Sequence, residues 1–342
     1  MASVTRVTDT KLDANANADR CHVALPPNTL VPIGGLLRRT FLWMAGNVWL
    51  RVHVPRLWFV RRAIRRFMPG EDAEDAIRAA ASFDSLGIGS VFTRLGENVT
   101  RIDEADDVAE HYLQPIADIA ERRLDGEISV KLTQLGLDLD VERAYVHLDR
   151  LTERVRASGI AVWIDMEGSA YTERTVALSE RLRPAHSNAG LCLQAYLRRT
   201  AADLRRFLPL GPAIRLVKGA YAEPASIAYQ TRREVDENYL ALAVMMLDAR
   251  NTGRTLRMTL GTHDIELVER AAAYAAAHGS TTGALEVHML YGIRPAEQRR
   301  LARAGYAVCT LIAYGAHWYP WYMRRLAERP ANIWFVLRQV LP

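Results

Sequence analysis

The stretch YAVCTLIAYGAHWYPWYMRRLAER, residues 306–329, joins an apolar run, a glycine and an aromatic-rich segment. The run Tyr306–Tyr314 favours a strand, and Gly315 supplies the turn after it. The segment that follows predicts the first turns of a helix with two adjacent arginines, Arg324 and Arg325. Each guanidinium can bind both oxygens of a carboxylate, and the helix N-terminus adds positive potential. The stretch therefore predicts a strand–turn–helix unit that grips a carboxylate; the alternative is that the Arg pair is only a solvated helix face.

The same kind of unit recurs along the chain from residue 87 onward. Short segments rich in Val, Ile and Leu alternate with longer amphipathic ones. The expected strands are Gly87–Phe92, Ile128–Leu132, Ala161–Asp165, Gly190–Tyr196, Ala213–Val217, Thr255–Leu260, Leu285–Leu290 and Tyr306–Ala313. The expected helices include Glu71–Leu86, His147–Ser158, Thr172–Leu182, Leu197–Phe207, Val235–Arg250, Asp264–Ala277 and Pro295–Ala304. Eight such units in about 250 residues predict an α/β fold, a (β/α)8 TIM-type barrel. A doubly wound open sheet is the alternative, but no G-x-G-x-x-G follows a predicted strand.

The composition is that of an ordinary globular protein. The chain has 342 residues, of which 49% are hydrophobic and 24% charged, with a net charge of +5. Its three cysteines, Cys21, Cys192 and Cys309, are too widely spaced for a disulfide framework or a metal cluster. A reducing compartment, the cytoplasm, is therefore the expected location.

The N-terminal 70 residues differ from the rest and are expected to form a separate region before a barrel of residues 71–342. Residues 1–30 are polar and predict a disordered start. Residues 31–68 contain no acidic residue, while arginines alternate with Trp43, Trp49 and Trp58. No apolar run there reaches the ~20 residues that span a bilayer, and no secretory signal is present. We expect a basic amphipathic helical arm that either wraps the domain or a sister subunit of a homo-oligomer, or lies peripherally on the inner face of a membrane. Nucleic-acid binding is not expected, because the charges beyond Arg66 are mixed.

Polar side chains gather where the predicted strands end, which is where (β/α)8 barrels place their chemistry. They include Thr93, Arg94, Glu97, Asn98, Lys131, Asp165, Glu167, Gln194, Arg215, Lys218, Thr262, His263 and Asp264. Because several cations are among them, we expect an anionic ligand. Asp165 and Glu167 lie two apart, which suits an acid–base pair of a glycoside hydrolase, a metal site, or ion pairs with barrel cations. No His cluster joins them, so no metal site is predicted. The backbone of RLVKGAY (215–221) can approach a flat ring or a phosphate.

Taken together, these segments resemble the proline dehydrogenase family, FAD-dependent (β/α)8 barrels that oxidise L-proline to Δ1-pyrroline-5-carboxylate. The matching stretches are GEN (96–98), VKLTQLG (130–136), IDMEG (164–168), QAYLRRT (194–200), RLVKGAY (215–221), TRR (231–233), GTHD (261–264), MLYGI (289–293) and WYMRRLAERPAN (321–332). The resemblance implies an oxidoreductase of proline metabolism that transfers a hydride from the carbon next to nitrogen to flavin N5. Family members pass the electrons to membrane quinone. Because the chain stops at Pro342, no fused aldehyde dehydrogenase domain is expected.

The resemblance also implies roles for individual residues. Lys131, Arg324 and Arg325 would hold the substrate carboxylate, Asp165 would orient that cluster, and Glu97 would form a gating ion pair with Arg324. The residues implied near the flavin ring are Arg215, Gln194, Val217, Lys218, Gly219, Ala220 and Tyr221. Those implied along the rest of FAD are Thr231, Arg232, Thr262, His263 and Glu328.

Two positions depart from the family pattern in the substrate pocket. Leu311 and Trp321 stand where the family usually has tyrosines that line the substrate ring, so the pocket is expected to be more apolar and differently shaped. Asp264, where the family often has Asn, is a smaller change near the flavin. A substituted proline, another cyclic amino acid or an N-modified amino acid is therefore an alternative substrate. Further alternatives are a non-flavin hydrolase that uses Asp165 and Glu167, and a catalytically idle homologue.

Overall fold

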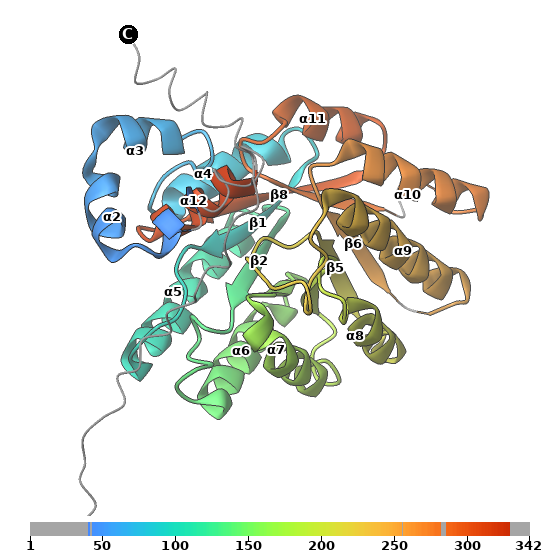
Figure 1. Cartoon of the computed structure of the whole chain (residues 1–342), viewed down its shortest axis with the longest axis horizontal. Coiled ribbons are helices and arrows are strands. Elements are labelled where there is room, and N and C mark those ends of the chain that lie inside the picture. The colour runs from blue at the N-terminus through green and yellow to red at the C-terminus, as the bar shows by residue number, and fades with distance from the viewer. Residues whose placement is uncertain (1–39, 42, 255, 282–284, 329–342) are drawn as a thin grey trace, which may run out of the picture.

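A computed structural model describes residues 40–41, 43–254, 256–281 and 285–328, with the side chains of residues 59, 63 and 328 left out. Eight parallel strands close into a barrel in chain order (Figure 1). The strands are β1 (Gly89–Arg94), β2 (Gly126–Lys131), β3 (Val162–Asp165), β4 (Ala189–Gln194), β5 (Ala213–Val217), β6 (Arg257–Gly261), β7 (Glu286–Leu290) and β8 (Ala307–Tyr314). The predicted (β/α)8 barrel is confirmed.

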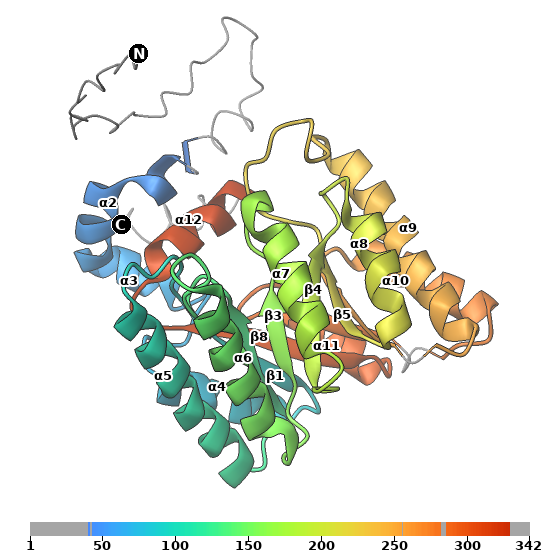
Figure 2. The same cartoon turned by 90° about the horizontal axis from the view of Figure 1, so that it is seen from below.

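Helices cover the outside of the barrel, as Figure 2 shows. They are α4 (Ala73–Asp84), α5 (Ile102–Glu121), α6 (Val141–Arg156), α7 (Ser169–Leu182), α8 (Thr200–Phe207), α9 (Arg232–Asn251), α10 (Ile265–Ala277) and α11 (Pro295–Arg303). Helix α12 (Trp318–Glu328) follows β8 and lies instead at the C-terminal ends of the strands. The short 3-10 helix η2 (Leu208–Leu210) follows α8. Because the strands are buried between these helices and the barrel interior, they read as nearly continuous apolar runs.

Several predicted boundaries were wrong, each for a local reason. Helix α6 begins at Val141, well before the expected His147, because the Asp140 side chain accepts a hydrogen bond from the backbone N–H of Arg143 and caps it. Helix α5 is missing from the expected helices; Pro115, a residue that usually ends a helix, lies inside it. Strand β8 ends at Tyr314, one residue later than the expected strand Tyr306–Ala313 and as the apolar run Tyr306–Tyr314 indicates.

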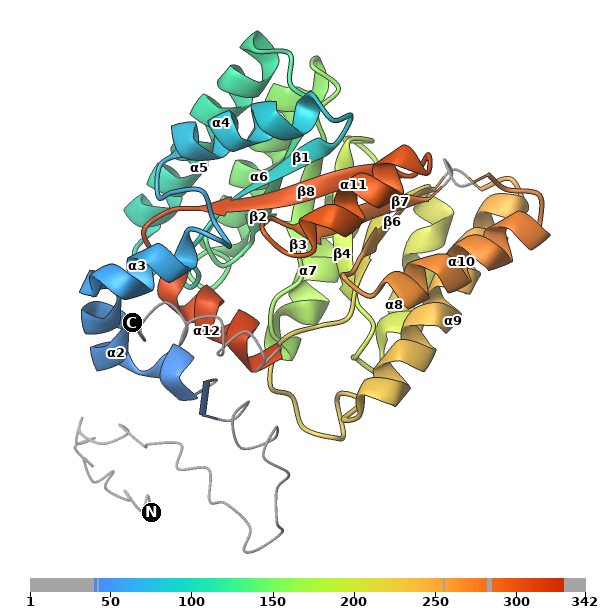
Figure 3. The same ribbon diagram turned by 90° about the horizontal axis from the view of Figure 1, so that it is seen from above.

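The described part of the arm is helical and packs on α12. It contains α2 (Val48–His53), the 3-10 helix η1 (Val54–Arg56) and α3 (Trp58–Ile64). All three cartoon views place α2 and α3 beside α12 (Figures 1–3). A hydrophobic cluster separate from the main core joins the two, and it includes Val60, Ile64, Phe67, Met68, Trp318, Tyr319, Trp321 and Tyr322. The predicted disordered start and the first residues of the arm, 1–39, lie outside the described residues.

None of the helices in the described part of the chain is both long and apolar enough to cross a membrane.

Candidate active site

A cavity of about 640 Å³ opens at the C-terminal ends of the strands, with α12 forming one wall. The predicted residues that line it are Glu97, Lys131, Asp165, Gln194, Arg215, Val217, Lys218, Gly219, Ala220, Tyr221, Arg232, Thr262, His263, Leu311, Trp321, Arg324 and Arg325. Two others do not. The Thr231 side chain accepts from the backbone N–H of Glu234 and caps α9, and the side chain of Glu328 lies outside the described residues. The structure thus gathers most of the predicted site in one cavity.

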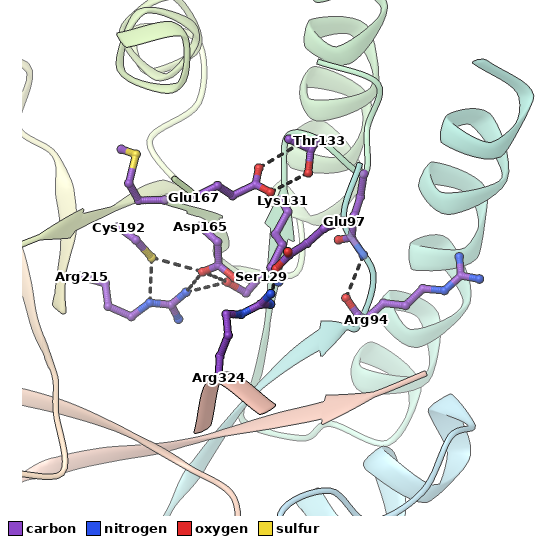
Figure 4. A network of polar contacts seen from close by, with 12 residues as sticks. Arg94, Glu97, Ser129, Lys131, Thr133, Asp165, Glu167, Cys192, Arg215 and Arg324 are labelled. Carbon is purple, nitrogen blue, oxygen red and sulfur yellow. Dashed lines mark hydrogen bonds and ion pairs between the residues drawn. The ribbon is translucent and has the colours of Figure 1, made fainter. Parts of the chain in front are cut away.

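The floor of this cavity is a buried carboxylate surrounded by donors. Asp165 ends β3 and accepts hydrogen bonds from Ser129 (2.8 Å) and from Arg215 Nη2 (2.6 Å) (Figure 4). Lys131 Nζ lies 3.6 Å from its other oxygen. Burial alone would raise the pKa of Asp165, but the charges of Arg215 and Lys131 outweigh it and hold that pKa below its usual value. Asp165 is therefore an ionised anchor that fixes two cations at the cavity.

The arginine pair of α12 enters the cavity from the opposite wall. Arg324 Nη2 donates to Glu97 Oε1 at 2.5 Å, and its guanidinium lies 5.6 Å from the ring centre of Tyr221. The Arg325 guanidinium lies 6.0 Å from the Trp321 ring. Lys131 and the two arginines thus face one space from different elements, β2 and α12. This arrangement suits a small carboxylate, because three positive groups can approach its two oxygens.

Glu167 does not form a catalytic pair with Asp165. Strand β3 ends at Asp165, so the two side chains no longer share a face, and Glu167 turns toward Thr133 (Figure 4). It accepts from the Thr133 backbone N–H at 3.1 Å and from the Thr133 hydroxyl at 2.5 Å. Burial raises the pKa of Glu167 to about 7. Because its carboxyl does not line the cavity, the geometry does not favour a two-carboxylate hydrolase.

At the wall formed by β4 and β5, the backbone of Gly219 packs directly against the Tyr196 ring. Gly219 has φ 105°, and a Cβ there would meet the Tyr196 ring at 2.1 Å, so only glycine fits. Gln194 donates from Nε2 to the Met166 carbonyl at 3.1 Å. Among the described residues its Oε1 has no hydrogen-bond partner, although it is buried at the cavity wall. A flat ring with an N–H on its edge would satisfy this acceptor.

A closed set of ion pairs borders the same wall. Lys218 pairs with Asp236 and, at 2.8 Å, with Asp264. Arg232 bridges the same two carboxylates at 3.2 and 2.9 Å. The set ties the loop after β5 to α9 and to the end of β6, so the rim of the cavity is held from three elements. Asp264, which departs from the family pattern, supplies two of the four contacts.

The remaining wall is apolar. Leu311 on β8 and Trp321 on α12 both line the cavity, together with Met289. Trp321 is only 9% exposed and also belongs to the hydrophobic cluster beneath the arm. Neither Leu311 nor Trp321 offers the hydroxyl that a tyrosine would present there.

Several residues of the site were missed from the sequence. His288 and Arg294 line the cavity, and Ser129 and Cys192 contact Asp165 and Arg215. Ser129 lies two before Lys131 on β2, and Cys192 two before Gln194 on β4. Side chains two apart on a strand share a face, so alternation counted back from the strand ends could have found both. Cys192 accepts from Arg215 Nε at 3.0 Å, and burial raises the pKa of its thiol to about 12, so it is a neutral hydrogen-bonding group.

The fold and the cavity together define a (β/α)8 barrel that gathers Lys131, Arg324 and Arg325 around one cavity at the C-terminal ends of its strands. The chain belongs to the proline dehydrogenase family, whose sequence profile matches residues 76–338. It is 35% identical over 306 residues to "Proline dehydrogenase 1" of Bacillus subtilis (strain 168), covering 90% of this chain and 99% of the relative. It is 32% identical over 281 residues to "Proline dehydrogenase" of Deinococcus radiodurans, covering 81% and 89%.

A solved structure shares the fold. Proline utilization A from Bdellovibrio bacteriovorus, inactivated by N-propargylglycine, matches with a TM-score of 0.74 at 20% identity, over 86% of this chain. The chain spans only 36% of that protein's length. At this identity the match shows the barrel architecture.

Proposed function

We propose that this chain is an FAD-dependent oxidoreductase that oxidises L-proline to Δ1-pyrroline-5-carboxylate. The observation that carries the proposal is the convergence of Lys131, Arg324 and Arg325 on one cavity whose other wall suits a flat ring. Membership of the proline dehydrogenase family supports both the substrate and the cofactor.

The described residues fit FAD. The unpartnered Oε1 of Gln194 can accept from a ring N–H, and the loop from Lys218 to Tyr221 lines the same cavity, with Gly219 held against Tyr196. Arg215 lines the same cavity and is the cation that we assign to the reactive edge of the flavin. Arg232, Thr262 and His263 lie further along the cavity and are assigned to the rest of the cofactor. When bound, FAD supplies the hydride acceptor.

The protein's own contribution is binding and orientation. Lys131, Arg324 and Arg325 hold the substrate carboxylate, and Asp165 keeps Lys131 in place. The substrate's C–H bond beside nitrogen breaks, and its hydrogen leaves with the electron pair as the C=N bond forms. The proton lost from nitrogen passes to solvent. Leu311 and Trp321 pack against the ring carbons and keep water out.

The Glu97–Arg324 ion pair closes the cavity over the substrate. It joins the loop after β1 to α12, and the pair lies beside Tyr221. A carboxylate on the substrate competes with Glu97 for Arg324, which links substrate binding to the state of this gate. This gating role is part of the proposal.

Anaerobic titration of the purified holoprotein tests the function. Rapid loss of the flavin absorbance band with L-proline supports it. Bleaching only by a substituted proline, pipecolate or an N-modified amino acid would show that Leu311 and Trp321 have redirected the pocket. A yellow protein that no amino acid bleaches would be an idle homologue, and a colourless protein would contradict the flavin assignment.

We further propose that the electron acceptor is a membrane quinone and that the arm makes a peripheral membrane contact. Trp43, Trp49 and Trp58 are 64%, 64% and 72% exposed. Exposed arginines surround them, so the surface is both aromatic and basic. Such a surface is suited to the headgroup region of an anionic bilayer.

A further inference from the structure

A chain of polar side chains runs through the barrel interior below the cavity. It begins at Arg215, which is 2% exposed, and continues through His288 on β7 to Glu286 and Arg257 at the N-terminal ends of the strands. Interiors of such barrels are normally filled by branched apolar side chains. Burying this many polar groups is costly unless each is hydrogen-bonded, so their arrangement needs a reason.

The contact between Arg215 and His288 defines the histidine tautomer. Arg215 Nη1 lies 3.4 Å from His288 Nδ1. A guanidinium can only donate, so Nδ1 must accept, and the ring hydrogen is carried by Nε2. That nitrogen lies 2.7 Å from Glu286 Oε1, to which it donates. His288 therefore couples a cation above it to a carboxylate below it.

Glu286 is itself fixed from below. Arg257 donates to its two oxygens from Nε (2.8 Å) and Nη2 (2.5 Å). Arg257 Nη1 also donates to Glu127 at 2.6 Å, and Glu127 accepts from the Trp163 ring nitrogen at 2.6 Å. The Trp163 ring has the guanidiniums of Arg215 and Arg257 at 4.9 and 5.1 Å. Each polar side chain in this series thus contacts the next one, so His288 has little freedom to move.

A metal site is the competing interpretation. Glu286, His288 and Cys309 bring ligand atoms within 4.8 Å of one another. However, Arg257 already occupies both oxygens of Glu286, so a metal ion would have to bind beside a guanidinium. The contacts favour a hydrogen-bonded support over a cation site.

At the cavity end of this series of polar side chains, the residue that is held in place is Arg215. Arg215 donates to Cys192 from Nε, to Ser129 and Asp165 from Nη2, and to His288 from Nη1. Three of these contacts lie on the Nε and Nη2 side of the guanidinium. His288 is the contact on Nη1, and it limits rotation of the group about its long axis.

We propose that His288 is a positioning residue for Arg215, holding its guanidinium at the cavity through the acceptor Nδ1. The assignment rests on the proposed function, because it takes Arg215 as the cation beside the flavin. A fixed positive charge there stabilises the negative charge gained on reduction and so raises the flavin's midpoint potential. Loss of the acceptor releases only the Nη1 edge, so the guanidinium tilts about the Nε and Nη2 side that Cys192, Ser129 and Asp165 still hold, and the potential falls.

The test compares His288→Gln with His288→Met in the FAD-loaded protein. A glutamine can accept from Arg215 with Oε1 and donate to Glu286 with Nε2, whereas methionine fills the space without a strong acceptor. The midpoint potential is measured with a chemical reductant and reference dyes, independently of proline. We expect His288→Met to lower the reduction equilibrium constant about tenfold, which is about 30 mV for two electrons. His288→Gln should stay within threefold of the parent protein.

Cys309→Ser is the matched control, because Cys309 contacts Glu286 at 3.8 Å in the same layer but does not contact Arg215. It should leave the potential unchanged. Equal shifts in all three variants would mean a general disturbance of the barrel and would overturn the proposal, as would an unchanged potential in folded His288→Met.

Should His288→Met not fold, His288→Asn replaces it, because its shorter amide does not reach Arg215 Nη1 and should lower the potential as methionine would. The asparagine variant is measured alone and combined with Arg215→Lys. In the Arg215→Lys background the asparagine should have no further effect, and a further shift would mean that His288 does not act through Arg215. A protein whose flavin is reduced by dithionite but not by any amino acid would refute the proposed function. Its midpoint potential could still be measured, so the proposal for His288 would still be tested.

Discussion

Arg324 and Arg325 are neighbours on α12 with different surroundings. Arg324 is held by Glu97 and Tyr221, whereas Arg325 lies against Trp321. Adjacent helix residues do not share a direction, so the two guanidiniums reach a substrate carboxylate from different sides. Their contributions should therefore be separable.

Replacing either arginine by alanine should raise the apparent KM for proline while FAD stays bound. A charge-assisted hydrogen bond contributes roughly 1.5–3 kcal/mol, so we expect an increase of about tenfold or more from each. Steady-state kinetics and the flavin-to-protein absorbance ratio measure this. Arg300→Ala, which removes a surface arginine paired with Glu297 and Glu269, is the control and should change neither. An unchanged KM in both α12 variants would rule out the carboxylate assignment.

Glu167 gives a prediction for stability against pH. Burial raises its pKa from the ordinary 4.5 to about 7, so the folded state binds an extra proton between these pH values. Its contribution to the free energy of unfolding is fully present below about pH 4.5 and is lost as the pH rises through about 7. Glu167→Gln can keep both contacts with Thr133 and does not titrate. Its advantage over the parent protein should thus grow between these pH values, by roughly 3 kcal/mol at most.

Denaturant unfolding of both proteins at several pH values measures the difference. Tyr171→Phe, at a tyrosine that bonds Asp138 on the surface, serves as a control with no expected trend in this range. A difference between Glu167→Gln and the parent that stays flat from pH 4.5 to 7 would show that Glu167 is not buried as described.

At the scale of single residues, the sequence could predict charged groups at strand ends but not their partners. Lys131 and Asp165 were found because each ends its strand, and Arg215 because it is a charged residue inside an apolar strand. His288 was missed because its partners lie on β5 and within β7, and their proximity depends on barrel closure. The sequence did not predict that the Glu167 side chain points toward Thr133, because that direction depends on the backbone after β3 ends at Asp165.

At the scale of elements, the turn after β5 decides whether a ring can bind. Gly219 there and Gly253 after α9 both have positive φ, 105° and 84°. A Cβ at Gly219 would meet Tyr196, whereas a Cβ at Gly253 would meet nothing within 4 Å. The pair therefore separates backbone strain from displacement of the Tyr196 ring that packs against this turn.

Gly219→Ala should lose FAD, while Gly253→Ala should keep it. In both variants the left-handed conformation of the new alanine costs roughly 1–2 kcal/mol of folding stability. Their melting temperatures should therefore fall by similar amounts, unless the clash with Tyr196 destabilises Gly219→Ala further. Fluorescence titration of the apoprotein with FAD measures the dissociation constant, for which we expect at least a tenfold rise in Gly219→Ala. Equal FAD affinity in the two variants would exclude the turn as part of the cofactor site.

The elements themselves were predictable to different degrees. Eight apolar segments identified the strands, because parallel strands buried on both faces carry continuous apolar runs. The first residues of helices were harder to predict from the sequence. The start of α6 depends on one hydrogen bond from the Asp140 side chain, and Pro115, which usually ends a helix, lies inside α5. The local hydrophobic pattern therefore predicts the barrel, whereas the capping contacts can be identified only once the backbone is folded.

At the scale of the whole molecule, the arm has two sides: one packs on α12, and the other is the surface that we propose contacts a membrane. One side contributes Val60, Ile64, Phe67 and Met68 to the cluster with α12. Deleting the arm would expose that face of α12, next to Trp321 in the cavity wall, and confound lipid binding with damage to the site. Substitutions on the exposed side avoid this problem.

We predict that replacing Trp43, Trp49 and Trp58 together by alanine lowers partitioning onto anionic vesicles at least tenfold. These indoles are largely exposed, so removing them costs little folding stability but removes most of the apolar area that lipid could cover. Flotation with vesicles of phosphatidylcholine and phosphatidylglycerol measures the partition. Alanine at Leu139, Val141 and Val146, exposed residues just before and within α6, is the matched control and should leave binding unchanged. Binding should also weaken with added salt, because the arm's arginines are exposed. If the triple tryptophan variant binds as the parent does, while its flavin is still reduced by proline, the arm does not dock on lipid and its exposed side is better assigned to a protein partner.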